Sequence, residues 1–151
     1  MKKFKYRVES YLKFLMFDRE KALKELRIAE TYRDNLIEKY IWMEGEMKKA
    51  YEINSGFGKG GKDIRYVNDN NKFIQMLKIH MRQLSEEIAF AESEFKKKHE
   101  SLMELQLKVK KIELHKESEY EKFKKERKKL EQKMTDEINS TRKRGRDAKS
   151  V

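Results

Sequence analysis

The glycines and lysines of GFGKGGKD, at residues 56–63, have the clearest potential for chemistry. A glycine, four further residues and then Gly-Lys form the start of a phosphate-binding loop, in which backbone N–H groups and the lysine hold nucleotide phosphates. The next residue should be Ser or Thr, to hold magnesium, but Asp63 stands there, and a long helical pattern precedes the segment where a strand is needed. We therefore interpret these residues as a flexible hairpin tip and not as a nucleotide site.

The remaining titratable residues do not form a recognisable site either. His80, His99 and His115 stand too far apart for metal-ligand pairs on one helix, and the absence of cysteine rules out thiolate zinc sites and disulfides. Carboxylates alternate with lysines at helical spacing, as between Glu119 and Lys125, which is typical of surface ion pairs. We expect no enzymatic activity, no metal, no cofactor and no small-molecule substrate.

The last ten residues are densely basic, with five Lys and Arg against one acidic residue. Arg142, Lys143, Arg144 and Arg146 could contact nucleic acid or anionic lipid. The alternative interpretation is a solvated, disordered terminus, and no aromatic residue lies nearby to stack on bases.

Aromatic residues gather on both sides of the glycine-rich segment. Two interpretations are open: a small core around the tip, or an exposed anchor surface for a protein partner, where Trp and Tyr are favoured. The residues are Tyr40, Trp42, Tyr51, Phe57, Tyr66 and Phe73.

Two long helical arms should position all of these residues. The first arm, about residues 3–53, has apolar residues in alternating steps of three and four, which is the coiled-coil repeat. Its two series are Val8, Leu15, Ala22, Ala29, Leu36, Met43 and Ala50, and Leu12, Arg19, Leu26, Arg33, Tyr40 and Met47. The second arm, about residues 70–141, repeats the spacing with Leu77, Leu84, Ala91, Lys98, Leu105 and Ile112, and with Met81, Ile88, Phe95, Leu102, Val109, Lys116, Phe123 and Leu130.

The link between the arms, about residues 54–69, contains four glycines and ends a helix. Asn54 or Gly56 suits the end of the first helix, and Asn68, Asp69 or Asn70 could begin the second. A link this short favours folding back, so the sequence predicts an all-α fold: two long helices in an antiparallel coiled-coil hairpin, forming one domain over residues 1–151 with a basic tail at 142–151. Met47 should lie near Leu77, Tyr40 near Leu84 and Val8 near Lys116.

Each helical residue adds roughly 1.5 Å of length, so the second arm extends well beyond the first. About the last 20 residues of the second arm therefore have no partner within the hairpin. This overhang still carries Phe123, Leu130 and Met134 on one face. The wide apolar stripe of the first arm also permits a homodimer with four helices. Charged residues make up 43% of the chain, the net charge is +11, and no long apolar run is present, so we expect a cytoplasmic protein.

The opening KFKYRVESYLKFLMFDREKALKEL, the two unequal heptad arms and the ending EQKMTDEINSTRKR resemble the FliJ family of flagellar export proteins. The resemblance extends over essentially the whole chain and is carried by Phe4, Tyr6, Arg7, Val8 and Leu12 at its start. It implies a coiled-coil stalk similar to the gamma subunit of rotary ATPases, located in the cytoplasm and associated peripherally with the inner membrane at the export apparatus.

The resemblance also implies protein partners: the hexameric export ATPase (FliI), the cytoplasmic domain of the export gate (FlhA) and the export chaperones, whose recycling the family assists. The positions matching the gate-binding stretches are Leu36, Tyr40, Met43, Met47, Phe73, Leu77, His80 and Leu84. The open end should contact the ATPase ring through Phe4, Val8, Phe123, Leu130 and Met134. Truncation after about Ser118 is then expected to abolish ring binding. An injectisome stalk and a basic hairpin that binds nucleic acid are the alternatives.

Overall fold

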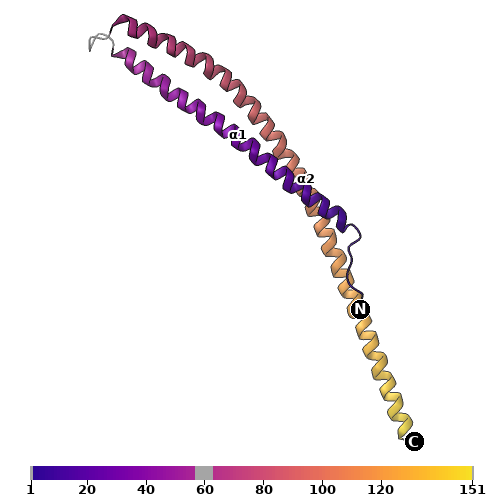
Figure 1. Ribbon diagram of the computed structural model, residues 1–151. Helices are drawn as coiled ribbons and strands as arrows, with labels where there is room; N and C mark the ends of the chain where they lie inside the picture. Colours follow the sequence, from indigo (N-terminus) through magenta and orange to yellow (C-terminus); the bar gives the residue numbers. More distant parts are fainter. Residues whose placement is uncertain (1, 57–62, 151) are drawn as a thin grey trace. The chain divides into compact units, whose positions relative to one another are not determined.

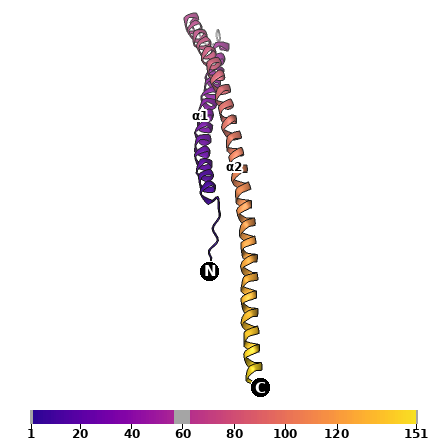
Figure 2. The ribbon, with the colours of Figure 1, turned by 90° about the vertical axis from the view of Figure 1, so that its right-hand side faces the viewer.

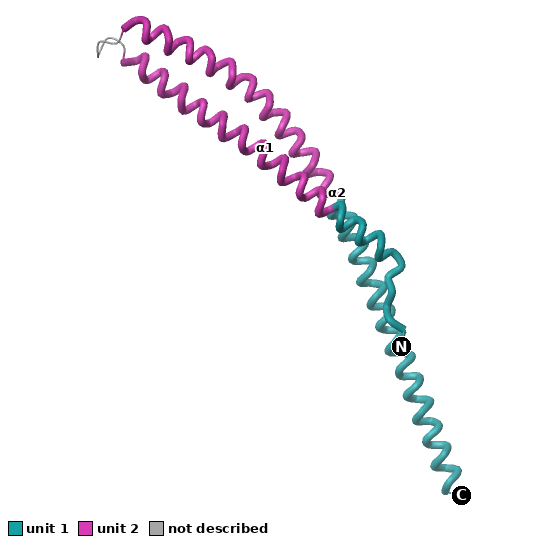
Figure 3. The backbone as a smooth tube through the Cα atoms, in the orientation of Figure 1, with its two compact units in different colours: residues 1–18, 105–151 teal, residues 19–104 magenta. Residues whose placement is uncertain are grey.

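The computed structural model describes residues 2–56 and 63–150, and these contain two helices, α1 (Glu9–Ser55) and α2 (Ile64–Lys149) (Figure 1). The described residues include no strand, and α2 is the longer helix, so the predicted all-α hairpin class is confirmed. The contacts divide the chain into unit 1, residues 1–18 with 105–151, and unit 2, residues 19–104 (Figure 3). The expectation of one domain over residues 1–151 stays a prediction.

In unit 2, α1 and α2 run side by side in opposite directions, as Figures 1 and 2 show. Their shared core contains Met43, Leu77, Met81 and Leu84, all at most 9% exposed, with Leu36, Tyr40, Met47 and Ile88 packed around it. This places Met47 in one cluster with Leu77, and Tyr40 in one cluster with Leu84, as the heptad spacing predicted. Each helix buries only one stripe, because a single helix covers it.

A polar contact interrupts the interior of unit 2 farther from the tip. The Arg33 guanidinium lies 4.3 Å from the ring centroid of Phe95, and its Nε and Nη2 donate to Asp34 Oδ1 at 3.0 and 2.9 Å. A cation above an aromatic face is attracted by the ring quadrupole. The arginine at a heptad position is therefore tolerated because its charge has two partners.

In unit 1, the first residues of the chain pack on α2. Leu12, Leu15 and Val109 form the core, with Met16, Leu105 and Ile112 against it. Lys116 Nζ lies 2.9 and 2.7 Å from the two carboxylate oxygens of Glu9. Lys116 thus pairs with Glu9, next to its expected neighbour Val8, which agrees with the antiparallel register.

The helix ends differ from those expected. Helix α1 begins at Glu9, not near Lys3, because the aromatic side chains of residues 4 and 6 pack on α2 from a non-helical segment. It ends as expected beside Gly56, whose N–H donates to the carbonyl of Glu52 at 3.3 Å.

Helix α2 begins at Ile64, well before the expected Asn70. Asp63 caps it, since its Oδ1 accepts from the N–H of Arg65 at 3.4 Å. The amide of Asn70 instead donates to Ala50 O and Asn54 Oδ1, both at 2.7 Å, and so links the two helices. The glycine-rich residues 57–62 lie outside the described residues.

The basic segment after residue 141 is helical up to Lys149 and not a disordered terminus. Arg146 and Lys149 lie in the last turn, where positive charge complements the partial negative charge of a helix C-terminus. Arginine and lysine are also good helix formers, so these residues continue α2.

Candidate partner-binding surfaces

The residues matched to a gate-binding surface lie in unit 2, and most of them face the other helix. Met43, Leu77 and Leu84 are buried at 9%, 3% and 5% exposure. Their side chains cannot contact a partner while the helices stay packed, because the seam itself covers them. Leu36, Tyr40 and Met47 are partly buried against the same core, and only Phe73 and His80 are exposed.

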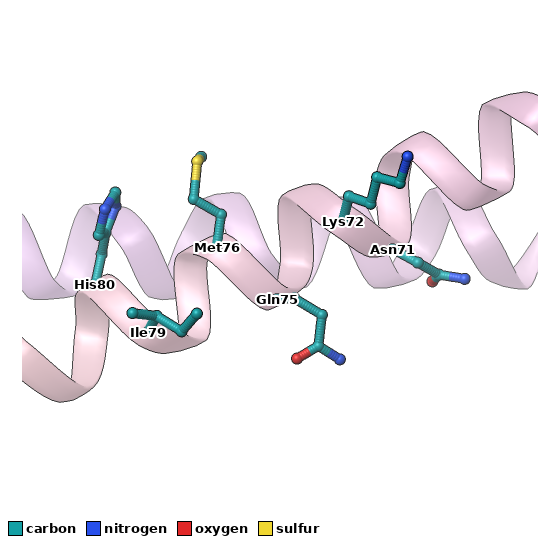
Figure 4. A pocket seen from close by; sticks show the side chains of 6 residues that line it. All are labelled: Asn71, Lys72, Gln75, Met76, Ile79 and His80. Atoms are coloured by element: carbon teal, nitrogen blue, oxygen red, sulfur yellow. The ribbon is translucent and has the colours of Figure 1, made fainter.

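The accessible apolar residues near this seam lie on its flank. Met76 and Ile79 are 45% and 59% exposed, and with His80 they line a shallow hollow on the outer surface of α2 (Figure 4). The other residues that line it are Asn71, Lys72 and Gln75. The heptad series did not include Met76 or Ile79, because both stand one or two positions away from its members.

The aromatic residues around the tip are exposed in the part of the chain that the structure describes. Trp42 is 62% exposed, Tyr51 46%, Tyr66 51% and Phe73 38%. Only Tyr40 of the described set packs on the core, and Phe57 lies outside the described residues. Of the two interpretations of these aromatics, the exposed one fits the described residues.

A second surface lies in unit 1, where the N-terminal segment crosses α2. The centroid of the Phe4 ring lies 5.2 Å from that of Tyr120 and 5.5 Å from that of Phe123. The first pair is edge-to-face, an arrangement that aromatic rings prefer, and the second is tilted. Tyr6 Oη lies 2.8 Å from His115 Nδ1 and donates to Ile112 O at 3.4 Å. These contacts bring Phe4 and Phe123 together.

Beyond this contact, α2 continues to Lys149 (Figure 2). Every residue from Lys124 to Ser150 is exposed. Leu130, Met134 and Ile138 follow one another at four-residue steps and are 62%, 65% and 55% exposed. Four-residue spacing places them on one side of the helix. Ile138 extends the row that the sequence predicted, and Val8, at 38% exposed, lies at the start of α1 in the same unit.

Ion pairs within α2 surround the start of the exposed segment. Lys122 Nζ donates to Glu119 Oε1 at 2.8 Å, and this hydrogen bond is the main cause that lowers the pKa of Glu119 and raises that of Lys122. The hydrogen bond from Lys124 lowers the pKa of Glu121 in the same way. Both pairs lie at the solvent-accessible surface, so they stabilise the charged forms without building a dry site.

Within residues 2–56 and 63–150, no three metal-ligating side chains come together. Neither helix, over its described length, has a segment long and apolar enough to cross a membrane. Two accessible features stand out among the described residues. Unit 2 has a helix pair with an exposed apolar flank, and unit 1 has a basic helix with an exposed apolar row.

These features define an all-helical protein that exposes apolar and basic side chains. Comparison with protein families gives a match to the flagellar FliJ protein family over residues 12–147. The chain therefore belongs to the FliJ family, whose members are non-enzymatic helical proteins of the flagellar export apparatus. Comparison with curated proteins gives no match, and neither does comparison with solved structures.

Proposed function

We propose that this protein is a coupling stalk of the flagellar export apparatus, which binds the export ATPase ring at one surface and the export gate at another. The observation that carries the proposal is the exposed apolar row Leu130, Met134 and Ile138 on a helix that belongs to an export-family chain. Contiguous exposed apolar patches on protein surfaces often mark sites that bind a partner.

The ring-binding surface consists, in this proposal, of Phe4, Val8, Phe123, Leu130 and Met134. Phe4 and Phe123 are in contact with each other. The exposed row of Leu130 and Met134 follows Phe123 along α2. A partner that covers Leu130 and Met134 removes two large apolar side chains from water, each a contribution of about 1 to 2 kcal/mol at these exposures.

Replacing Leu130 and Met134 together by Gln tests this surface in the full chain. Both residues are exposed, so the helix pair is expected to keep its stability, while affinity for the purified export ATPase falls at least tenfold in a pull-down or titration. The matched control replaces Leu107 and Leu114, which are 58% and 56% exposed in the same unit, by Gln. Equal affinity of the two variants would contradict the assignment.

The tip-side surface supports the second contact, with the cytoplasmic domain of the export gate. Because the packed seam covers Met43, Leu77 and Leu84, the contact uses the exposed Phe73 and His80 together with the neighbouring Met76 and Ile79. Leu36, Tyr40 and Met47 are only partly buried against the seam core, and we include them in the proposed contact. The seam residues act indirectly, by holding the two helices in register.

The gate contact is tested by replacing Phe73 and Ile79 with Ser and measuring binding of the gate's cytoplasmic domain. The control is Ile28→Ser, which removes a residue of unit 2 that is 69% exposed and farther from the tip. We expect a loss of at least tenfold for the double variant and less than twofold for the control. Loss in both, or in neither, would remove the support for a tip-side site. Association with the inner membrane and chaperone recycling belong to the same proposal.

A further inference from the structure

The C-terminal part of α2 combines two features that the proposed ring contact does not explain together. Between Lys124 and Lys149 the chain has eleven Lys and Arg residues against five Asp and Glu. This segment is helical, and all of its residues are exposed. It thus presents a net charge of +6 on one helix, with the apolar row of Leu130, Met134 and Ile138 along one side.

The basic charge is densest after the apolar row ends. Arg142, Lys143, Arg144, Arg146 and Lys149 lie within the last turns of α2, where Asp147 is the one acidic residue. The helix holds these charges at short, regular intervals, because successive residues rise by about 1.5 Å. Such a density of positive charge attracts a polyanionic surface.

We propose that residues 124–149 bind the surface of an anionic lipid bilayer. An interfacial helix uses basic residues to approach lipid phosphates and large apolar residues to enter the boundary between headgroups and acyl chains. Both components are present and exposed here. Binding to nucleic acid would explain the basic charge but not the apolar row, since Leu130, Met134 and Ile138 have no role on a phosphate backbone. The segment also contains no aromatic residue that could stack on bases.

The lipid contact competes with the proposed ring contact, because both use Leu130 and Met134. A helix that has this row in a bilayer cannot present it to a protein at the same time. Membrane-bound chains and ring-bound chains are then separate populations, and lipid binding is measurable with no ATPase present.

Flotation of the full-length chain with vesicles tests the proposal. The vesicles contain phosphatidylcholine with or without about 30 mol % phosphatidylglycerol, at about 50 and about 150 mM NaCl. We expect binding to the anionic vesicles only, weakened by salt. Equal binding to neutral vesicles, or none to anionic vesicles at the lower salt, overturns the proposal.

Two variants separate the charged and apolar components. The first changes Arg142, Lys143, Arg144 and Arg146 to Gln. We expect at least a tenfold loss, because each basic residue near an anionic surface contributes roughly fivefold in affinity. Its matched control removes four exposed lysines from elsewhere in α2, Lys96, Lys108, Lys110 and Lys111, and should lose less than threefold. Equal losses would show diffuse charge attraction and overturn the assignment to residues 124–149.

The second variant changes Leu130, Met134 and Ile138 to Gln and keeps every charge. Vesicle binding should fall at least fivefold, whereas binding to a DNA duplex at the same salt should not change. If the variant binds vesicles like the unaltered chain, or if the unaltered chain binds the duplex more tightly than the vesicles, the segment is a general polyanion-binding helix and the lipid proposal is wrong.

Discussion

Leu77→Ala should destabilise unit 2 strongly, because the stability of this helix pair depends on a thin seam. Leu77 is 3% exposed and lies in one cluster with Met43, Met81 and Leu84. The substitution removes three carbon atoms and leaves the backbone of α2 in place, since Ala is the best helix former.

The magnitude follows from the burial of Leu77. At about 0.8 kcal/mol per buried methylene, three carbons contribute roughly 2.4 kcal/mol. A residual cavity adds to this, but a seam between two helices borders solvent and can partly close around it. We therefore expect a loss of about 2 to 3 kcal/mol in the free energy of unfolding, in the lower part of the range for buried Leu→Ala changes.

Urea denaturation followed by far-ultraviolet circular dichroism and by the fluorescence of Trp42 measures this loss. With a denaturant dependence of about 1 to 3 kcal/mol per molar urea, the midpoint should fall by roughly 0.7 to 3 M. Ile79→Ala is the matched control, since Ile79 lies two residues further along α2 and is 59% exposed. It should change stability by less than about 0.5 kcal/mol.

The result that would refute this reasoning is a similar effect of both substitutions. A loss below about 1 kcal/mol for Leu77→Ala would mean that the seam does not bury this residue in solution. A large loss for Ile79→Ala would mean that the outer face of α2 is covered, for instance by a second copy of the chain, and sedimentation equilibrium would then detect the dimer.

Three further predictions concern single features of the structure. Gly45→Ala should raise the free energy of unfolding by about 0.5 to 1 kcal/mol in thermal or urea denaturation, because an added Cβ at this helical position meets nothing within 4 Å. A double-mutant cycle with Glu9→Gln and Lys116→Met should give a coupling below about 1 kcal/mol that decreases with salt, since both side chains are more than a third exposed. Lys122 lowers the pKa of Glu119, so the contribution of this carboxylate to helix stability is present above the ordinary glutamate pKa and is lost as the pH falls through the lowered pKa. The carboxyl chemical shift of Glu119 should therefore titrate below the ordinary range. Lys122→Gln should return the pKa of Glu119 to that range.

The sequence alone predicted two long helices and many of the residues between them. Leu12, Leu15, Leu77, Leu84 and Val109 all belong to the heptad series, and all are buried. This part is predictable because a repeat of 3.5 residues brings the same side of a helix to its partner over many turns, and few other structures satisfy such a pattern. The short glycine-rich link in the sequence also favoured packing of the two arms of one chain against each other.

Tertiary structure decided what the repeat leaves open, namely which apolar residues stay accessible. Met43 and Trp42 are adjacent in sequence, yet one is 9% and the other 62% exposed, because a second helix covers only one stripe. The heptad pattern could not distinguish a seam residue from one that binds an external partner, since both require an apolar side chain at the same spacing. Only the packed pair shows that the matched positions of unit 2 lie mostly in the seam, that Phe4 lies against Tyr120 and Phe123, and that the row from Leu130 to Ile138 has no cover among the described residues.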